Sequence, residues 1–184
     1  MTHTPSLTLG DDHWLSPARH CPSPHYDERP GGEVSLLVVH SISLPPAQYG
    51  GPYIDQLFLG TLDPDEDAYF AQIHQLRVSA HCLIRRDGEL VQYVPFNKRA
   101  WHAGQSNFNG RERCNDFAIG IELEGTDTDT FTKAQYQQLI TVTRLLQARY
   151  PAITTQHIVG HSDIAPGRKT DPGSGFNWDF IDEV

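Results

Sequence analysis

The sequence predicts a single α/β domain with a central mixed β-sheet flanked by helices. Short apolar runs rich in β-branched residues, typical of buried strands, are separated by segments with helical periodicity. An Asp-Gly turn joins two of these runs into a hairpin, and a capping box opens one long helix. Strands separated by helices favour an α/β sheet, and the hairpin adds an antiparallel pair to it.

Size and composition set limits on function. At 184 residues the chain has the size of one domain, and its net charge of −9 argues against nucleic acid as a partner and against anionic membrane surfaces. Three cysteines without C-x-x-C spacing do not form a disulfide framework, and the N-terminus lacks the pattern of an export signal. We therefore expect a cytoplasmic protein, and we expect it to be a monomer.

The first half of the chain begins with a polar, proline-rich arm. Residues 1–32 are predicted to form an irregular arm that packs on a domain of residues 33–184, with a short helix near Trp14. Residues 35–40 read as a buried strand, and short helices are predicted at 54–59 and 66–76.

The second half contains the clearest local signals. Residues 80–85 and 89–94 flank Arg86-Asp87-Gly88 and predict the hairpin. Further strands are predicted at 100–102 and 117–124, and a capping box at Thr132 opens a helix over 132–149. From His161 onward the composition is typical of loops.

Four of the ten histidines lie on or just after apolar segments, namely His40, His81, His102 and His161. His40 and His161 each end an apolar run, and Asp171 follows ten residues after His161. Two imidazoles and a carboxylate are a ligand set of catalytic zinc sites, in which water takes the fourth position. Spacing alone leaves open the alternative that each is an ordinary polar residue at a strand end.

Two other catalytic chemistries are disfavoured. His81 and Cys82 are adjacent, so on a strand their side chains point to opposite faces and cannot act as a nucleophile–base pair. No G-x-S-x-G nucleophile elbow occurs in the sequence.

Five blocks in order carry a resemblance that covers nearly the whole chain from Trp14. They read LLVVHSISLPP, SAHCLIRRDGELVQYVPF, RAWHAG, NDFAIGIELEGTD and GHSDIAPGRKTDPG. In these blocks the chain resembles the AmpD-type branch of the N-acetylmuramoyl-L-alanine amidases. The resemblance implies a mixed sheet packed by helices with Zn²⁺ in a surface groove.

The resemblance also implies roles for individual residues. His40, His161 and Asp171 would be the zinc ligands; related phage endolysins carry a cysteine at the position of Asp171. Glu122 would be the acidic catalytic residue and Lys169 the catalytic lysine. Without the resemblance, Lys169 would read as a surface lysine in a Gly/Pro-rich loop.

Four residues are candidates for substrate contact. Arg77 and Arg113 suit peptide carboxylates, because a guanidinium pairs with them bidentately, and Trp101 suits stacking on a sugar. The ordinary alternatives are solvated arginines and a core tryptophan. Ser41 stands where AmpD-type enzymes usually carry asparagine, which changes one expected hydrogen bond to substrate.

The expected reaction is zinc-dependent hydrolysis of the amide between (1,6-anhydro)-N-acetylmuramic acid and L-alanine, with an anhydro-muropeptide as substrate in cytosolic cell-wall recycling. The alternatives are a non-catalytic module that binds peptidoglycan fragments and a zinc peptidase with the same ligands. Glu122 and Glu124 alternate with Ile121 and Leu123 and should leave the same face of their strand. Only the resemblance selects Glu122 as catalytic.

Overall fold

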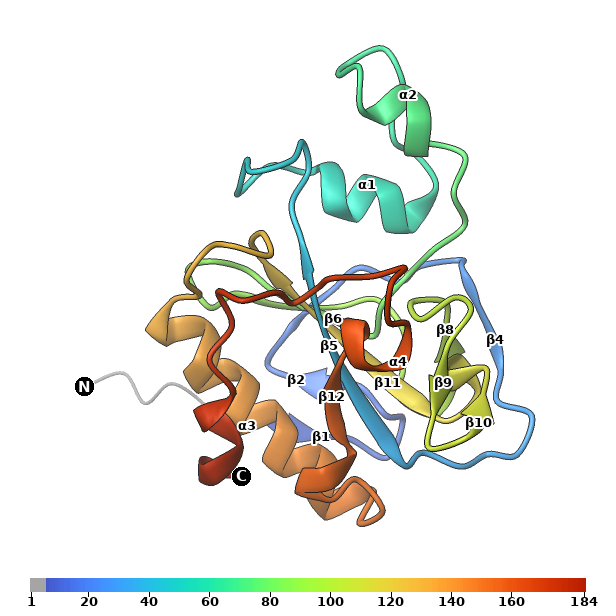
Figure 1. The fold of residues 1–184 in the computed structure, drawn as a ribbon, viewed down its shortest axis with the longest axis vertical. Helices are drawn as coiled ribbons and strands as arrows, with labels where there is room; N and C mark the ends of the chain where they lie inside the picture. Colours follow the sequence, from blue (N-terminus) through green and yellow to red (C-terminus); the bar gives the residue numbers. More distant parts are fainter. Residues whose placement is uncertain (1–5) are drawn as a thin grey trace.

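Six strands form the central sheet of the computed structural model, which describes residues 6–184 (Figure 1). Their order across the sheet is β12 (Ile158–Gly160), β5 (Leu36–Ile42), β11 (Ala118–Glu124), β6 (Cys82–Ile84), β7 (Leu90–Gln92) and β3 (Arg19–His20). The first four are parallel to one another, whereas β7 is antiparallel to β6. The predicted mixed sheet is confirmed.

The two longest strands, β5 and β11, lie side by side at the centre of the sheet. Each spans seven residues, every residue of β11 is buried, and the register places Glu122 beside His40. Strands buried on both faces read as continuous apolar runs, which explains why these two were visible in the sequence.

Helices cover both faces of the sheet. On one face, α3 (Lys133–Arg149) packs against a core that includes Leu37 and Ile121. On the other, α4 (His161–Ile164) packs near Val38, and α1 (Tyr53–Leu59) packs near Leu83. Figure 1 shows α1 and α2 (Phe70–Ile73) together at the end of the molecule toward which β5 runs, away from α3.

The capping box and the hairpin are both present as predicted. Thr132 Oγ1 accepts from the Gln135 backbone N–H at 3.1 Å, and Gln135 Oε1 accepts from the Thr132 backbone N–H at 3.0 Å. The Gln135 side-chain amide also donates to the carbonyls of Ile84 and Glu124, so the start of α3 is fixed to the sheet.

Two predicted elements differ in extent. The helix expected over 66–76 is only α2, because the carboxylates of Asp63 and Asp67 bond nearby backbone N–H groups in turns that compete with a helix. The strand expected at 100–102 is β8 (Lys98–Ala100) and ends earlier, since Asn115 Oδ1 takes the N–H groups of His102 and Ala103.

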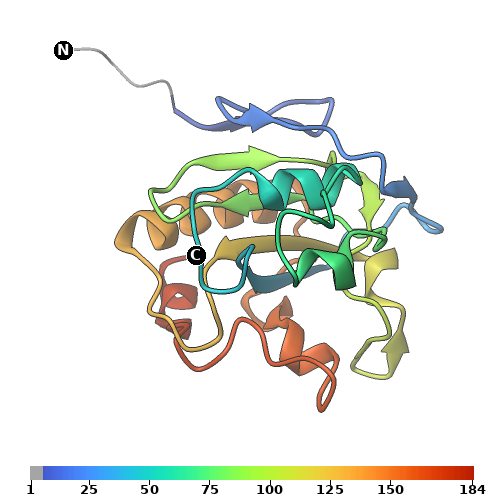
Figure 2. The same cartoon turned by 90° about the horizontal axis from the view of Figure 1, so that it is seen from above.

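The N-terminal arm is more regular than predicted, and its residues 1–5 lie outside those described. No helix forms near Trp14; instead that residue follows a turn between β1 (Thr8–Leu9) and β2 (Leu15–Ser16). β3 adds to the main sheet beside β7, and β4 (Tyr26–Glu28) pairs with β8. Figure 2 shows the arm, in blue, running along this edge of the molecule.

The remaining elements are short. They are β9 (Asn107–Phe108), β10 (Arg111–Glu112) and the 3-10 turns Cys114–Asp116, Thr155–His157 and Trp178–Glu183. Within residues 6–184 no helix is both long and apolar enough to cross a bilayer.

Arg29 fastens the arm to the domain. Its guanidinium is buried and donates to the carbonyls of Phe96, Asn115 and Ala118 at 2.9–3.3 Å. Burial lowers the pKa of Arg29 to about 10, which still leaves the side chain charged at neutral pH. Three backbone carbonyls of the domain of residues 33–184 therefore accept from one side chain of the arm.

We expect Arg29→Ala to lower the free energy of unfolding by about 3 kcal/mol, because it leaves buried carbonyls without a donor. Arg144, an exposed arginine of α3 whose side chain donates to the Glu183 carbonyl, is the matched control, and Arg144→Ala should cost less than about 1 kcal/mol. Urea unfolding of the two variants measures both values. Equal losses would contradict the role given to Arg29.

Candidate active site

Three donor atoms from His40, His161 and Asp171 converge at one edge of the sheet. His40 Nδ1 lies 3.1 Å from His161 Nδ1 and 3.0 Å from Asp171 Oδ2, and His161 Nδ1 lies 3.1 Å from the same oxygen. Both histidines are buried and Asp171 is half-buried. The cluster predicted from the sequence is thus assembled by the fold.

Parallel strands bring these residues together. His40 lies in β5, His161 follows directly after β12, and Glu122 lies in β11. Because the carboxyl ends of parallel strands meet at one edge, their side chains share one site. Asp171 is held there by a hydrogen bond from the Ser162 backbone N–H to its carbonyl.

The donor set fits a zinc ion. Tetrahedral bonds of about 2.0–2.1 Å would place neighbouring ligand atoms roughly 3.3 Å apart, close to the separations observed. His161 Nε2 lies 3.0 Å from the Ala103 carbonyl, so its proton belongs on Nε2 and the Nδ1 lone pair is free for a metal. Two histidine nitrogens and a carboxylate oxygen are also the ligand chemistry that zinc prefers.

The protonation states favour metal binding as well. Burial lowers the pKa of His40, which keeps the imidazole neutral near pH 7. Burial alone would raise the pKa of Asp171, but its close contacts with the imidazoles of His161 and His40 outweigh burial and hold that pKa well below its usual range. A neutral imidazole and an ionised carboxylate are the forms that ligate metals.

Glu122 faces the cluster from the neighbouring strand. Burial, followed by the nearby charge of Asp171, raises the pKa of the Glu122 carboxyl well above its usual range. Its Oε2 atom is buried without a hydrogen-bond partner among the described residues, as is Nε2 of His102. A carboxyl that binds a proton readily beside a candidate metal site suits general acid–base chemistry.

Glu124 has a different environment two residues further along the strand. Its carboxylate pairs with Arg85 at 3.1 Å and accepts from the backbone N–H groups of Gly50 and Arg86. The two acidic residues, indistinguishable by pattern, therefore differ in their partners: Glu124 is satisfied by the protein and Glu122 is not.

The cluster opens into a cavity of about 420 Å³. His40, His161, Asp171, Glu122 and Lys169 all line it. Apolar side chains make up much of the remaining wall, namely Leu44, Pro46, Leu57, Phe58, Tyr69, Ile73, Leu76 and Val78. A cavity lined by a few polar groups and by an apolar wall can orient an amphipathic ligand.

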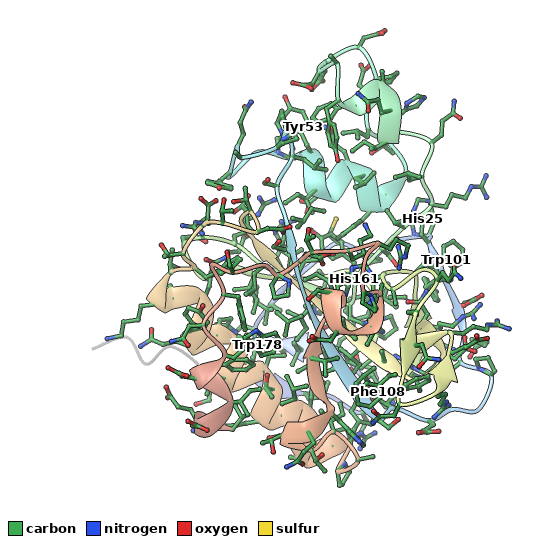
Figure 3. All side chains as sticks on the ribbon, in the orientation of Figure 1. His25, Tyr53, Trp101, Phe108, His161 and Trp178 are labelled. Carbon is green, nitrogen blue, oxygen red and sulfur yellow. The ribbon has the colours of Figure 1, made fainter. Side chains whose placement is uncertain are left out.

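The predicted substrate contacts do not all lie in this cavity. Ser41 and Trp101 line it; Ser41 Oγ donates to Asp127 at 3.0 Å, and the Trp101 indole donates to Asp27 at 3.2 Å. Figure 3 shows Trp101 next to His25, and their rings stack at 6.0 Å.

The two arginines lie outside the main cavity. Arg77 is exposed and lines a smaller adjoining cavity together with Trp101 and Lys169. Arg113 is exposed, pairs with Asp116 and lines a separate cavity with Arg168.

Sequence reasoning gave no role to His102 or Asp127. Nδ1 of His102 lies 2.9 Å from Nε2 of His40, and Asp127 accepts from the hydroxyls of Ser41 and Thr170. His102 had been singled out only as a histidine after an apolar segment. No local pattern marks Asp127, whose contacts come from segments distant in the sequence.

Comparison with known proteins identifies the class. The family model described as N-acetylmuramoyl-L-alanine amidase matches residues 30–174. The chain belongs to the N-acetylmuramoyl-L-alanine amidase family, and it is an enzyme of that class.

Within the family the similarity is to AmpD. The 1,6-anhydro-N-acetylmuramyl-L-alanine amidase AmpD of Salmonella typhimurium is 68% identical over 171 residues, which cover 92% of this chain and 91% of that protein. A crystal structure of a selenomethionine derivative of AmpD superposes with a TM-score of 0.92 at 65% identity, covering 95% of this chain and 98% of that one. The resemblance predicted from the sequence blocks is confirmed.

A more distant structure carries a ligand. The amidase AmiD from E. coli, in complex with the substrate anhydro-N-acetylmuramic acid-L-Ala-D-γ-Glu-L-Lys, matches with a TM-score of 0.60 at 27% identity. The match covers 97% of this chain and 65% of that one.

The contrast between the two acidic residues generates a prediction. We expect Glu122→Ala to retain metal and stability while kcat falls about 10²–10⁴-fold, because a proton-transfer group is lost. Glu124→Ala should instead cost on the order of 3 kcal/mol of stability, since it removes one of the carboxylates that pair with buried Arg85 and the acceptor of the Gly50 and Arg86 backbone N–H groups.

Metal content, melting temperature and kcat, measured side by side for both variants, show which of the two carboxylates is catalytic. A normally stable but inactive Glu124→Ala variant would show that the catalytic carboxylate had been assigned to the wrong residue.

Proposed function

We propose that this chain is a zinc-dependent amidase that hydrolyses the bond between 1,6-anhydro-N-acetylmuramic acid and L-alanine in soluble muropeptides, in the cytoplasm during cell-wall recycling. The observation that carries the proposal is the triangle of His40 Nδ1, His161 Nδ1 and Asp171 Oδ2 beside the unpartnered carboxyl of Glu122. Similarity to AmpD supports the choice of sugar and of bond.

His40, His161 and Asp171 would hold the zinc ion. When bound, zinc supplies Lewis-acid chemistry: it polarises a carbonyl and lowers the pKa of water toward about 7. Glu122 would accept a proton from the attacking water and deliver it to the leaving L-alanine nitrogen, which must be protonated to depart. The raised pKa of Glu122 suits the second half of that transfer.

Lys169 lies at the rim of the same cavity. Its ammonium would stabilise the negative charge that develops on the amide oxygen as water adds to the carbonyl carbon. Its charge also lowers the pKa of Glu122, partly opposing burial. Lys169 and Glu122 are therefore coupled through one small polar region.

We assign the substrate-binding residues from the chemical character of their side chains. The apolar wall around Leu57 and Phe58 and the indole of Trp101 suit the faces of a sugar, on which C–H groups predominate. Arg77 and Arg113 are exposed cations that suit the carboxylates of the peptide. Ser41 is already bonded to Asp127, so its role would include holding that loop.

Experiment can separate the proposed amidase from two alternative functions, a binding module and a zinc peptidase. A module that only binds fragments has no need of an unpartnered carboxyl facing a metal site, so the position of Glu122 favours catalysis. A zinc peptidase could use the same ligands, and its products would differ.

Mass spectrometry of the products from an anhydro-muropeptide tests the proposal. We expect release of the anhydro sugar and an intact peptide, loss of turnover with a chelator, and recovery with added zinc. Turnover on insoluble sacculi should be far slower. Free amino acids as products would indicate a peptidase, no turnover would indicate a binding module, and full activity in metal-free protein would refute the metal's role.

A second measurement concerns Lys169. Lys169→Ala should keep zinc and leave KM nearly unchanged while kcat falls on the order of a hundredfold, as for loss of an oxyanion donor. Lys133, an exposed lysine at the start of α3, is the control, and Lys133→Ala should leave both constants unchanged. A change confined to KM would mean that Lys169 only holds substrate.

A further inference from the structure

Two consecutive residues, His102 and Ala103, each contact one of the two histidines of the candidate metal site. His102 Nδ1 lies 2.9 Å from Nε2 of His40, and the Ala103 carbonyl lies 3.0 Å from Nε2 of His161. Both residues belong to the loop that follows β8. In each histidine the ring nitrogen turned away from the cluster is therefore held by this loop.

The proton positions follow from these contacts. Nδ1 of His40 can ligate a metal only if its lone pair is free, so the ring proton must be on Nε2. That N–H then donates to Nδ1 of His102, and His102 carries its own proton on Nε2. Ala103 fixes His161 in the same way, since a carbonyl can only accept.

Gly120 of β11 leaves space on the sheet for the His102 ring. A Cβ atom added to Gly120 of β11 would lie 2.4 Å from Cγ and 2.5 Å from Nδ1 of His102, distances that no side chain tolerates. Glycine at this position therefore makes room for the imidazole beside His40. The two rings meet edge to face, with centroids 5.0 Å apart.

Hydrogen bonds to the Asn115 side chain hold the backbone of this loop in position. Asn115 Oδ1 accepts from the N–H groups of His102 and Ala103 at 3.1 and 2.8 Å. The carbonyl of Asn115 in turn accepts from buried Arg29, which links the loop to the N-terminal arm. Backbone and side chain of the dipeptide are thus positioned independently of the metal ligands.

We propose that His102 is a positioning residue that selects the Nε2-protonated tautomer of His40, so that its Nδ1 lone pair faces the metal, while the Ala103 carbonyl does the same for His161. This inference rests on the proposed metal dependence. Partners of metal-bound histidine are usually carboxylates, carbonyls or water. A neutral imidazole orients His40 without adding negative charge to a site that already contains Asp171 and Glu122.

The test is the zinc affinity of the metal-free protein, measured by competition with a chromophoric chelator. His102→Leu removes the acceptor and should weaken zinc binding about 10–100-fold. His102→Asn places an amide oxygen near the position of Nδ1 and should stay within about threefold of wild type. Gly120→Ala keeps His102 but displaces its ring, and should weaken zinc binding as His102→Leu does.

Two controls separate this proposal from the metal site itself. Asp171→Ala should lose most zinc affinity, and His25→Asn, a change at another buried histidine that does not contact the ligands, should retain it. Melting temperatures without zinc identify any variant that fails to fold. The visible spectrum of the cobalt-substituted protein should change in His102→Leu and be restored in His102→Asn.

The outcomes are distinct. Wild-type zinc affinity in both His102→Leu and Gly120→Ala, with affinity lost in Asp171→Ala, would overturn the role of His102 and leave the metal site standing. Equal weakening in His102→Leu and His102→Asn would also overturn it, because the acceptor would then not matter. Absence of zinc binding in wild-type protein would instead refute the proposed function.

Discussion

The structure depends on holding three electron-pair donors about 3 Å apart at the edge of a buried sheet. His40, His161 and Asp171 each present a lone pair to the same small volume. Such an arrangement repels itself unless a proton or a cation is shared among the donors. The parallel strands, the neutral imidazole of His40 and the ionised carboxylate make it suited to a cation, and the rest of the site is organised around that position.

Much of the fold could be predicted because its signals are local. Buried strands such as β5 and β11 are apolar on both faces, and the Asp-Gly hairpin and the Thr132 capping box need only neighbouring residues. The N-terminal arm was mispredicted as irregular because β3 and β4 form only against β7 and β8, which are distant in sequence. Two- and three-residue strands carry too little pattern to be recognised alone.

The three residues of the candidate metal site were predicted from their types and from the sequence blocks, but their surroundings were not. Glu122 and Glu124 have the same pattern, and only the tertiary partners Arg85 and Gly50 distinguish them. His102 reaches His40 across a sequence separation that no motif spans. Sequence patterns therefore identified ligand types, whereas hydrogen-bond networks between distant segments determine which nitrogen of each ring faces the site.

X-ray absorption at the zinc edge tests the central claim most directly. We predict one zinc per chain with two imidazole nitrogens at about 2.0–2.1 Å, completed by oxygen ligands and without sulfur. Asp171→Cys should introduce a sulfur scatterer at about 2.3 Å, because that residue is assigned to the first coordination shell. A shell without imidazole, or one unchanged by Asp171→Cys, would contradict the account.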